Sequence, residues 1–273
     1  EVHLVHKVKI MSFAPMAAFD VFIDVKTGKI VSKISLSSNA NTPGNVQTYY
    51  NGWKPITCFY DSYYNDYNLE DFSRMIGTYD ATYSPWVNWP PSADYITSPS
   101  PNFVWDWNEM AKSAGNDAHW GMKKTYDFYQ TTFGRDSYDN QGGIIRQYIN
   151  PPNMQGAGNT NNAYASSDGI IGGQTMMVYG LGDGIDMDFV TALDVMGHEF
   201  THNVDAFTAN LTYEEEYGAL DESFADIMGY SIKHATTGAT NWTIGEDLYV
   251  NVSNPPSPPI MRSYKSECLF VIS

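Results

Sequence analysis

Alternation of apolar and polar residues marks the first 37 residues as strands. Residues 2–10 and 19–25 alternate, the turn-like stretch 26–29 reads Lys-Thr-Gly-Lys, and residues 30–34 continue the alternation. Period-two alternation around a glycine-containing turn is typical of an antiparallel sheet. We therefore predict a small N-terminal β-sheet, followed by a polar linker that begins near residue 38 and offers a site for processing.

After the linker, the apolar residues follow strand-like spacing in some segments and helical spacing in others. Residues 47 to about 190 are rich in Tyr, Thr, Asn and Gly, which predicts a twisted β-rich region with one helix at 108–133. Helical spacing returns at 190–208 and 216–236. The predicted fold class is α+β in three parts: residues 1–37 as a separate sheet, 38–207 as a β-rich domain ending in a central helix, and 208–273 as a partial α-helical domain.

The helix predicted at 190–208 carries His198-Glu199-Phe200-Thr201-His202, an H-E-x-x-H motif. Residues four apart lie on one helix face, so both imidazoles can bind one metal ion while Glu199 acts on a water molecule. A motif with three fixed positions matches by chance in roughly one in a hundred chains of this length. The alternative is a solvated helix face with two unrelated histidines, and the surrounding sequence must decide.

The next predicted helix offers a third ligand. Glu222 and Asp226 are four apart on one face, so Glu222 can complete the metal set while Asp226 accepts the free ring N–H of a liganding histidine. Apolar neighbours predict that this helix is largely buried, and buried carboxylates need a cation or another partner. The combination predicts a hydrolytic zinc site. The apolar neighbours are Ala219, Leu220, Phe224, Ala225 and Ile227.

These residues resemble the thermolysin-like neutral zinc metalloproteases, a family of gluzincins. In that family H-E-x-x-H is followed, after nineteen residues, by a glutamate and one turn later by an aspartate; here residues 203–221 supply the nineteen. The resemblance runs from about residue 40 to 263 and is strongest over 160–250. It implies a thermolysin-like fold, a zinc cofactor and peptide-bond hydrolysis with Glu199 as the general base. It also implies that residues 1–37 end a propeptide that inhibits or chaperones the enzyme, although an ordinary β-meander of the catalytic domain is the alternative.

Further site residues are implied by the same resemblance. Asn162, Ala163 and Tyr164 would bind the substrate as an added strand, Tyr213 would help to hold the oxyanion, and Arg262 would bind a substrate carbonyl. An apolar pocket for the residue after the scissile bond predicts cleavage before hydrophobic residues. That pocket would be lined by Phe189, Val195, Ile244, Leu248 and Met261.

Calcium is implied as well, but with a reduced ligand set. Asp194 and Glu246 match acidic ligands of the family's paired-calcium site, Asn241 stands where an aspartate is usual, and Lys233 stands where a glutamate is usual. An ammonium group at that position could replace one calcium ion. We therefore expect one calcium ion at the Asp194 and Glu246 locus.

Composition agrees with a secreted, extracellular enzyme. We expect it to be a monomer that acts on proteins or peptides. The net charge, 15 − 31 = −16, disfavours binding to nucleic acid or anionic membranes. No apolar run reaches transmembrane length. Only Cys58 and Cys268 are present, and they could pair, but two cysteines do not form a disulfide framework. The first residue is Glu rather than Met, which suggests a processed or clipped sequence.

The C-terminal part departs from the family. The resemblance stops after Arg262-Ser263, whereas family members continue with more helices and a catalytic histidine that no later residue here replaces. A missing lobe would leave apolar surface exposed on the active-site helix. Two hypotheses stay open: a secreted zinc endopeptidase, or a degenerate fragment that binds zinc without efficient turnover. A zinc aminopeptidase, which would need eighteen residues before the glutamate, is disfavoured.

Overall fold

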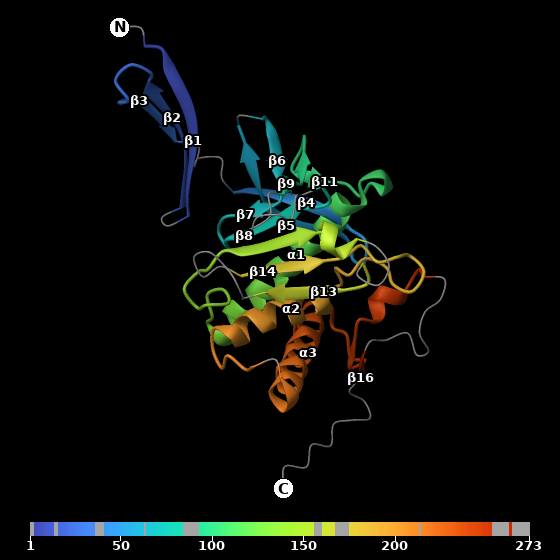
Figure 1. Cartoon of the computed structure of the whole chain (residues 1–273). Coiled ribbons are helices and arrows are strands. Elements are labelled where there is room, and N and C mark those ends of the chain that lie inside the picture. The colour runs from blue at the N-terminus through green and yellow to red at the C-terminus, as the bar shows by residue number, and fades with distance from the viewer. Residues whose placement is uncertain are drawn as a thin grey trace.

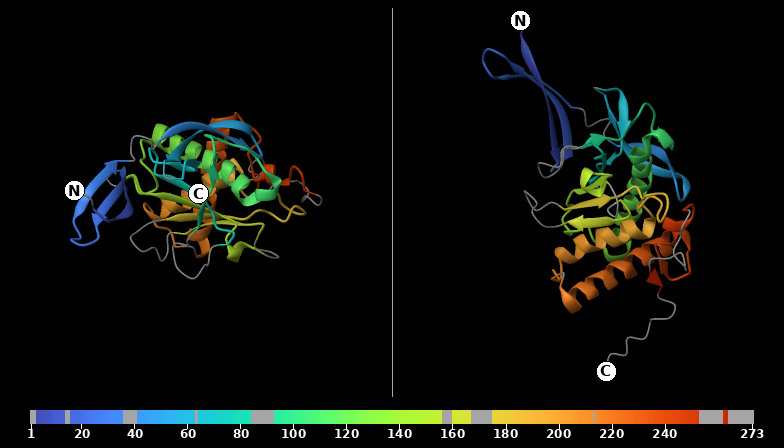
Figure 2. Two further views of the ribbon diagram at one scale, coloured as in Figure 1. Left: turned by 90° about the horizontal axis from the view of Figure 1, so that it is seen from above. Right: turned by 45° about the vertical axis from the view of Figure 1, so that its right-hand side comes forward.

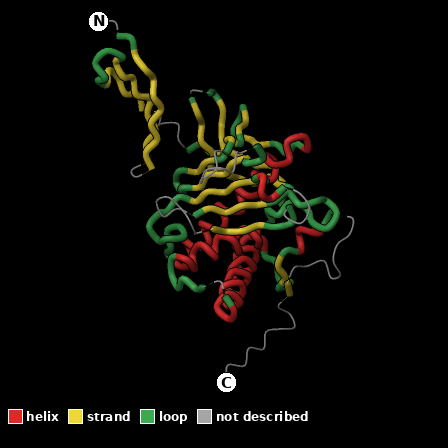
Figure 3. Tube along the Cα trace, in the orientation of Figure 1, coloured by secondary structure: helices red, strands yellow, loops and turns green. Residues whose placement is uncertain are grey.

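A computed structural model of the chain describes residues 3–13, 16–35, 41–62, 64–83, 93–155, 160–166, 175–212, 214–252 and 262–263. Figures 1 and 3 show strands in the upper part of the molecule and two long helices below them. The described residues form three α-helices and three short 3-10 turns. The helices are α1 (Met110–Phe133), α2 (Leu193–Ala206) and α3 (Glu215–Thr237), with 3-10 turns η2 (Trp107–Glu109), η3 (Pro152–Met154) and η4 (Glu246–Tyr249).

The N-terminal sheet has the predicted antiparallel form. Strands β1 (Val5–Phe13), β2 (Met16–Asp24) and β3 (Ile30–Ser35) pair in the order β1-β2-β3. The turn after β2 forms because Oδ1 of Asp24 accepts the backbone N–H groups of Lys26 and Thr27, and because Gly28 takes a φ of +68°. Figure 2 shows this sheet standing out from the rest of the chain. Its role as the end of a propeptide stays a prediction.

Two further sheets build the β-rich part. One has the order β10-β6-β5-β4-β11 and the other the order β13-β14-β12-β8-β7, with β9 paired to β8. Strand β13 is the outermost strand at one edge of the second sheet, and β7 lies at the other edge. The strands are β4 (Thr42–Thr48), β5 (Gly52–Asp61), β6 (Asp66–Asn68), β7 (Glu70–Asp71), β8 (Ile76–Asp80), β9 (Asp94–Tyr95), β10 (Thr97–Ser98), β11 (Asn102–Phe103), β12 (Ile145–Ile149), β13 (Ala163–Ser166) and β14 (Met176–Tyr179), and the short pair β15 (Thr243–Ile244) and β16 (Arg262–Ser263) lies beyond α3.

Helix α1 lies between the sheets and α2. Ala114, Ala118 and Met122 are fully buried on it, and Gly115 packs so closely that a Cβ there would lie 2.2 Å from Cδ1 of Ile96. Small residues on this face let the helix approach the strands, and larger apolar residues fill the core around it. The predicted helix at 108–133 is therefore confirmed from residue 110, with one 3-10 turn before it.

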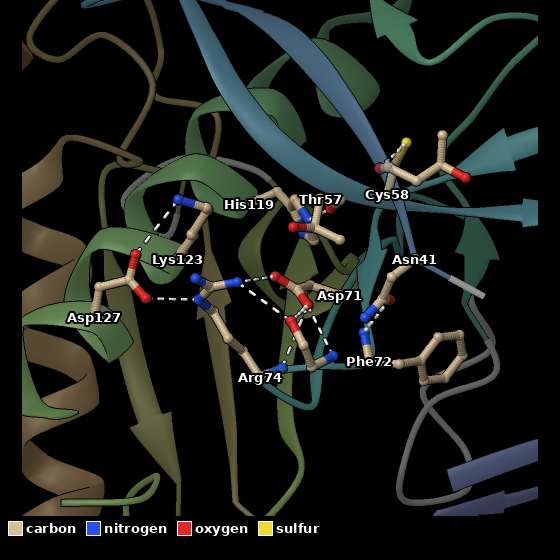
Figure 4. A network of polar contacts seen from close by, with 11 residues as sticks. Asn41, Thr57, Cys58, Asp71, Phe72, Arg74, His119, Lys123 and Asp127 are labelled. Atoms are coloured by element: carbon tan, nitrogen blue, oxygen red, sulfur yellow. Dashed lines mark hydrogen bonds and ion pairs between the residues drawn. The ribbon is translucent and has the colours of Figure 1, made fainter. Parts of the chain in front are cut away.

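Polar side chains also tie α1 to the strands (Figure 4). Arg74, just before β8, donates from Nη1 to Oδ2 of Asp71 at 2.8 Å and from Nε to Oδ1 of Asp127 on α1 at 2.6 Å. His119 lies fully buried between the hydroxyl of Thr78 and the carbonyl of Thr57. These contacts account for His119 as a packed core histidine.

Helices α2 and α3 cross at two glycines. A Cβ on Gly229 would lie 2.4 Å from the backbone oxygen of Asp194, and a Cβ on Gly197 would lie 3.0 Å from Cα of Gly229. Because any larger side chain would push the helices apart, the crossing sets the position of α3 residues relative to those of α2.

One face of α3 is apolar and exposed. Leu220, Phe224 and Ile227, spaced for one helix face, are 57%, 43% and 50% exposed. The prediction that α3 is largely buried is therefore wrong for this face. Asp221, Glu222 and Asp226 instead lie on the side that meets α2.

Candidate metal centre

The H-E-x-x-H segment lies inside α2, where regular helix places the two histidines one turn apart on the same face. Their Nε2 atoms are 3.0 Å apart. Glu222 on α3 faces both rings: Oε2 is 3.5 Å from Nε2 of His198, and Oε1 is 3.6 Å from Nε2 of His202. Within the described ranges, these three side chains form a group with the spacing of metal ligands.

The three separations fit a zinc ion. Bonds of about 2.0–2.2 Å at a tetrahedral angle place ligand atoms roughly 3.3–3.6 Å apart. The two Nε2 atoms are 3.0 Å apart, and each lies 3.5 or 3.6 Å from one of the two oxygens of Glu222, which is close to that spacing. Two imidazole nitrogens and one carboxylate form a typical catalytic zinc set, which leaves the fourth position to water or substrate. Calcium and magnesium prefer oxygen ligands throughout.

Each liganding imidazole has a carboxylate on its other nitrogen. Nδ1 of His198 donates to Oδ1 of Asp226 at 2.8 Å, and Nδ1 of His202 donates to Oδ2 of Asp221 at 2.8 Å. Both rings therefore keep the lone pair of Nε2 directed at the metal position. Burial by itself would lower the pKa of His198, but the hydrogen bond to Asp226 and the charge of Glu199 raise it.

Asp221 is the functional residue that the sequence reasoning missed. The sequence prediction gives Asp226 to one liganding histidine and names no partner for the other. The available signal was the pair Asp221-Glu222, two successive acidic residues within a largely apolar segment. Because successive residues on a helix are about 100° apart, Asp221 lies beside the ligand face and reaches the outer nitrogen of His202.

Glu199 lies between the metal ligands and the outermost strand. It is 6% exposed, and burial raises the pKa of its carboxyl, an effect that the nearby His198 and His202 partly offset. The backbone N–H of Ala165 on β13 donates a hydrogen bond to it. A buried carboxylate of raised pKa beside a metal position is suited to take up and return a proton.

The residues predicted to bind the substrate backbone lie on or beside β13. The backbone oxygen of Asn162 accepts the N–H of Gly180 at 2.9 Å, and Ala163 pairs with Tyr179 of β14. The hydroxyl of Tyr164 accepts from Nδ2 of Asn153 at 2.9 Å. The structure thus places this outermost strand next to Glu199, where an extended peptide can add to the sheet.

The four described residues of the predicted pocket are buried. Phe189, Val195, Ile244 and Leu248 are 5%, 6%, 3% and 0% exposed. Phe189 packs against the rings of Tyr49 and Trp105, with centroids 5.0 Å away in each case. These residues are apolar and lie on elements that flank the site, and their role in specificity stays a prediction.

Several predicted residues cannot be placed. Tyr213 and Met261 lie outside the described residues, as does Cys268. Arg262 is described only in its backbone, which pairs with Ile244. Cys58 is buried, and burial raises the pKa of its thiol to about 12. Its pairing with Cys268 is not tested, because Cys268 lies outside the described residues.

The locus predicted to bind calcium contains an ammonium group. Nζ of Lys233 lies 3.1 Å from Oδ2 of Asp194, 2.7 Å from Oε1 of Glu246 and 2.7 Å from Oδ2 of Asp247. Nδ2 of Asn241 donates to the same oxygen of Glu246 at 2.5 Å. The donor set does not fit the expected calcium ion, because a cation of the protein itself already lies among the carboxylates.

Comparison with known proteins matches two family models, the thermolysin metallopeptidase catalytic domain over residues 43–206 and the thermolysin metallopeptidase alpha-helical domain over residues 209–265. An extracellular elastase of Staphylococcus epidermidis is 36% identical over 247 residues, 90% of this chain and 45% of that protein. A bacillolysin of Bacillus amyloliquefaciens is 34% identical over 263 residues, 92% of this chain and 46% of that protein. The chain thus spans about half the length of the curated relatives it matches.

A solved structure, the precursor of the metalloproteinase protealysin from Serratia proteamaculans, is 29% identical, with a TM-score of 0.48 over 63% of this chain and 48% of that one. The helices in the described part of the chain include none that is both long and apolar enough to cross a membrane.

Proposed function

The chain belongs to the thermolysin metallopeptidase family, and we propose that it acts as a secreted zinc-dependent endopeptidase. The observation that carries the proposal is the arrangement of His198, His202 and Glu222 at the ligand separations of tetrahedral zinc, with Glu199 buried beside them. Secretion is supported by the extracellular elastase among its relatives.

Zinc would be held by His198, His202 and Glu222, and when bound it supplies Lewis-acid chemistry that polarises a carbonyl and lowers the pKa of water. Glu199 would accept the proton of the attacking water and later donate it to the leaving amine. Asp221 and Asp226 would keep both imidazoles in the tautomer that presents Nε2. Tyr213 would donate to the developing oxyanion.

Substrate binding would use the outermost strand. The backbone of Ala163, with Asn162 and Tyr164 beside it, would pair with an extended peptide next to Glu199. Arg262 would bind a substrate carbonyl. The apolar side chains at 189, 195, 244 and 248 favour a hydrophobic residue after the scissile bond. Calcium has no part in this proposal, because Lys233 fills the centre of the cluster at Asp194 and Glu246.

A second candidate is a chain that binds zinc without efficient turnover. Apart from the two ligands, no described histidine lies at the metal position. His119 is enclosed by Thr57 and Thr78, and His234 bonds the carbonyl of Ala239. His3 and His6 lie at the N-terminal sheet, where His3 bonds Asp24 and His6 lies on β1. An additional imidazole for the oxyanion is therefore lacking among the described residues.

Casein hydrolysis by the zinc-loaded 273-residue chain, beside a Glu199→Gln variant, separates the two candidates. Zinc-dependent hydrolysis that the variant loses, with zinc content unchanged, supports the endopeptidase. Stoichiometric zinc with hydrolysis no higher than in the variant supports the second candidate. Loss of zinc binding in both proteins would refute the metal site itself.

A further inference from the structure

Lys233 is a buried cation inside a cluster of three carboxylates. Its side chain is 6% exposed, and its ammonium group contacts Asp194, Glu246 and Asp247 at 3.1, 2.7 and 2.7 Å. The three N–H donors of the ammonium thus meet three separate anions. The pKa of Lys233 is raised because the attraction of Asp194 and Asp247 outweighs the burial that would lower it.

The cluster joins three elements. Asp194 lies in the first turn of α2, one turn before the ligand His198; Lys233 lies near the end of α3; and Glu246 and Asp247 open η4. The backbone N–H of Gly245 also donates to Oδ2 of Asp194 at 2.9 Å. The cluster therefore holds together the two helices that carry all three zinc ligands.

Calcium does not fit alongside this ammonium. The ion needs six to eight oxygen ligands at about 2.3–2.6 Å, and it would have to share carboxylates with a positive charge already hydrogen-bonded to each of them. Two buried oxygens, Oδ1 of Asn241 and Oε2 of Glu246, form no hydrogen bond within the described part of the chain. Two oxygens, one of them neutral, are too few to bind the ion.

We propose that the ammonium group of Lys233 takes the place of a metal ion at this locus and cross-links α2, α3 and η4 without calcium. The formal charge of the group is then −3 + 1 = −2, carried by carboxylates that also receive N–H groups from Gly245 and Asn241. Lys233 consequently cross-links the two helices that carry the zinc ligands, and this contribution does not depend on free calcium. The proposal stands independently of whether the chain hydrolyses peptides.

The test measures thermal unfolding of the zinc-loaded 273-residue chain in calcium-free buffer and in calcium chloride. An ion at about 100-fold excess over its dissociation constant would raise Tm by roughly 5–10 °C for a chain of this size. We expect no such rise in the natural sequence. Lys233→Gln removes the charge and keeps much of the side-chain volume. We expect it to lower Tm by roughly 10 °C without calcium and to regain part of that loss when calcium is added.

Lys112→Gln is the matched control, because Lys112 forms a surface ion pair with Glu109, and it should change neither Tm nor the calcium response. The Glu246→Gln variant shows whether any calcium ion that raises Tm binds at this cluster. A calcium-induced rise in the natural chain that disappears in Glu246→Gln would overturn the proposal, since the ion would then bind beside Lys233. A Lys233→Gln variant with unchanged Tm would also overturn it. If Lys233→Gln does not fold in either buffer, calcium titration of the natural chain and of Glu246→Gln still decides the matter.

Discussion

Replacing Asp221 by alanine removes the carboxylate behind His202 and should weaken zinc binding. The Asp221 side chain is 9% exposed and lies 2.8 Å from Nδ1 of the ring, so solvent screens the hydrogen bond little. A hydrogen bond to a charged group contributes about 1.5–3 kcal/mol, and each 1.4 kcal/mol is a factor of ten. We therefore expect zinc affinity to fall by about 10- to 100-fold, the range typical of such outer carboxylates.

The assay is competition for zinc between the protein and a chromophoric chelator, which needs no catalytic turnover. Asp221→Asn keeps an acceptor but not the charge, so its loss should be smaller than that of Asp221→Ala. Ser231→Ala is the control on the same helix, because that hydroxyl bonds only the carbonyl of Ile227 in the contacts described. Zinc affinity of Asp221→Ala within twofold of the natural chain would refute the role assigned to Asp221.

Three further predictions concern stability. Gly229→Ala should lower the free energy of unfolding in urea by about 1–3 kcal/mol and also weaken zinc binding, because the added Cβ forces α2 and α3 apart. An unchanged free energy of unfolding and unchanged zinc affinity would mean that the helices do not cross tightly at this residue. Arg74→Ala should cost about 3 kcal/mol, since it leaves the fully buried Asp71 without its cation, whereas Lys112→Ala should cost less than 1 kcal/mol; equal losses would contradict this. Burial raises the pKa of Glu70 to about 7, so the protein should lose stability as pH rises from about 4.5 to 7, and Glu70→Gln should remove that part of the pH dependence in thermal unfolding; identical profiles would argue against a buried neutral carboxyl.

The sign of the pH effect follows from the direction of the shift. A carboxyl whose pKa is higher in the folded chain than in the unfolded chain binds its proton more tightly when folded. Its contribution is complete below the unfolded value and is lost as pH rises through the folded value. Oε1 of Glu70 accepts from the hydroxyl of Tyr79 at 3.1 Å, a bond that glutamine can keep.

The sequence alone determined the features that depend on short-range periodicity. Spacing of four on a helix placed His198 and His202 on one face, and alternation around residues 26–29 predicted the N-terminal sheet. The β-rich region and all three helices were also predictable, because apolar spacing along one element is a local property. The α+β class is accordingly confirmed by the structure.

Tertiary structure decided which side chains share a partner. Composition made α3 look buried, yet Leu220, Phe224 and Ile227 are exposed, since helical periodicity does not say which side of an apolar helix is covered. The sequence does not predict the contact of Asp221 with His202 or the position of the Lys233 ammonium among the carboxylates, because both depend on how closely α3 approaches α2. Backbone contact at Gly229 sets that approach and thereby brings residues 28 to 39 positions apart, such as Asp226 with His198 and Lys233 with Asp194, within hydrogen-bonding distance. Contacts between elements are fixed by close packing of the whole core, which no local pattern in the sequence encodes.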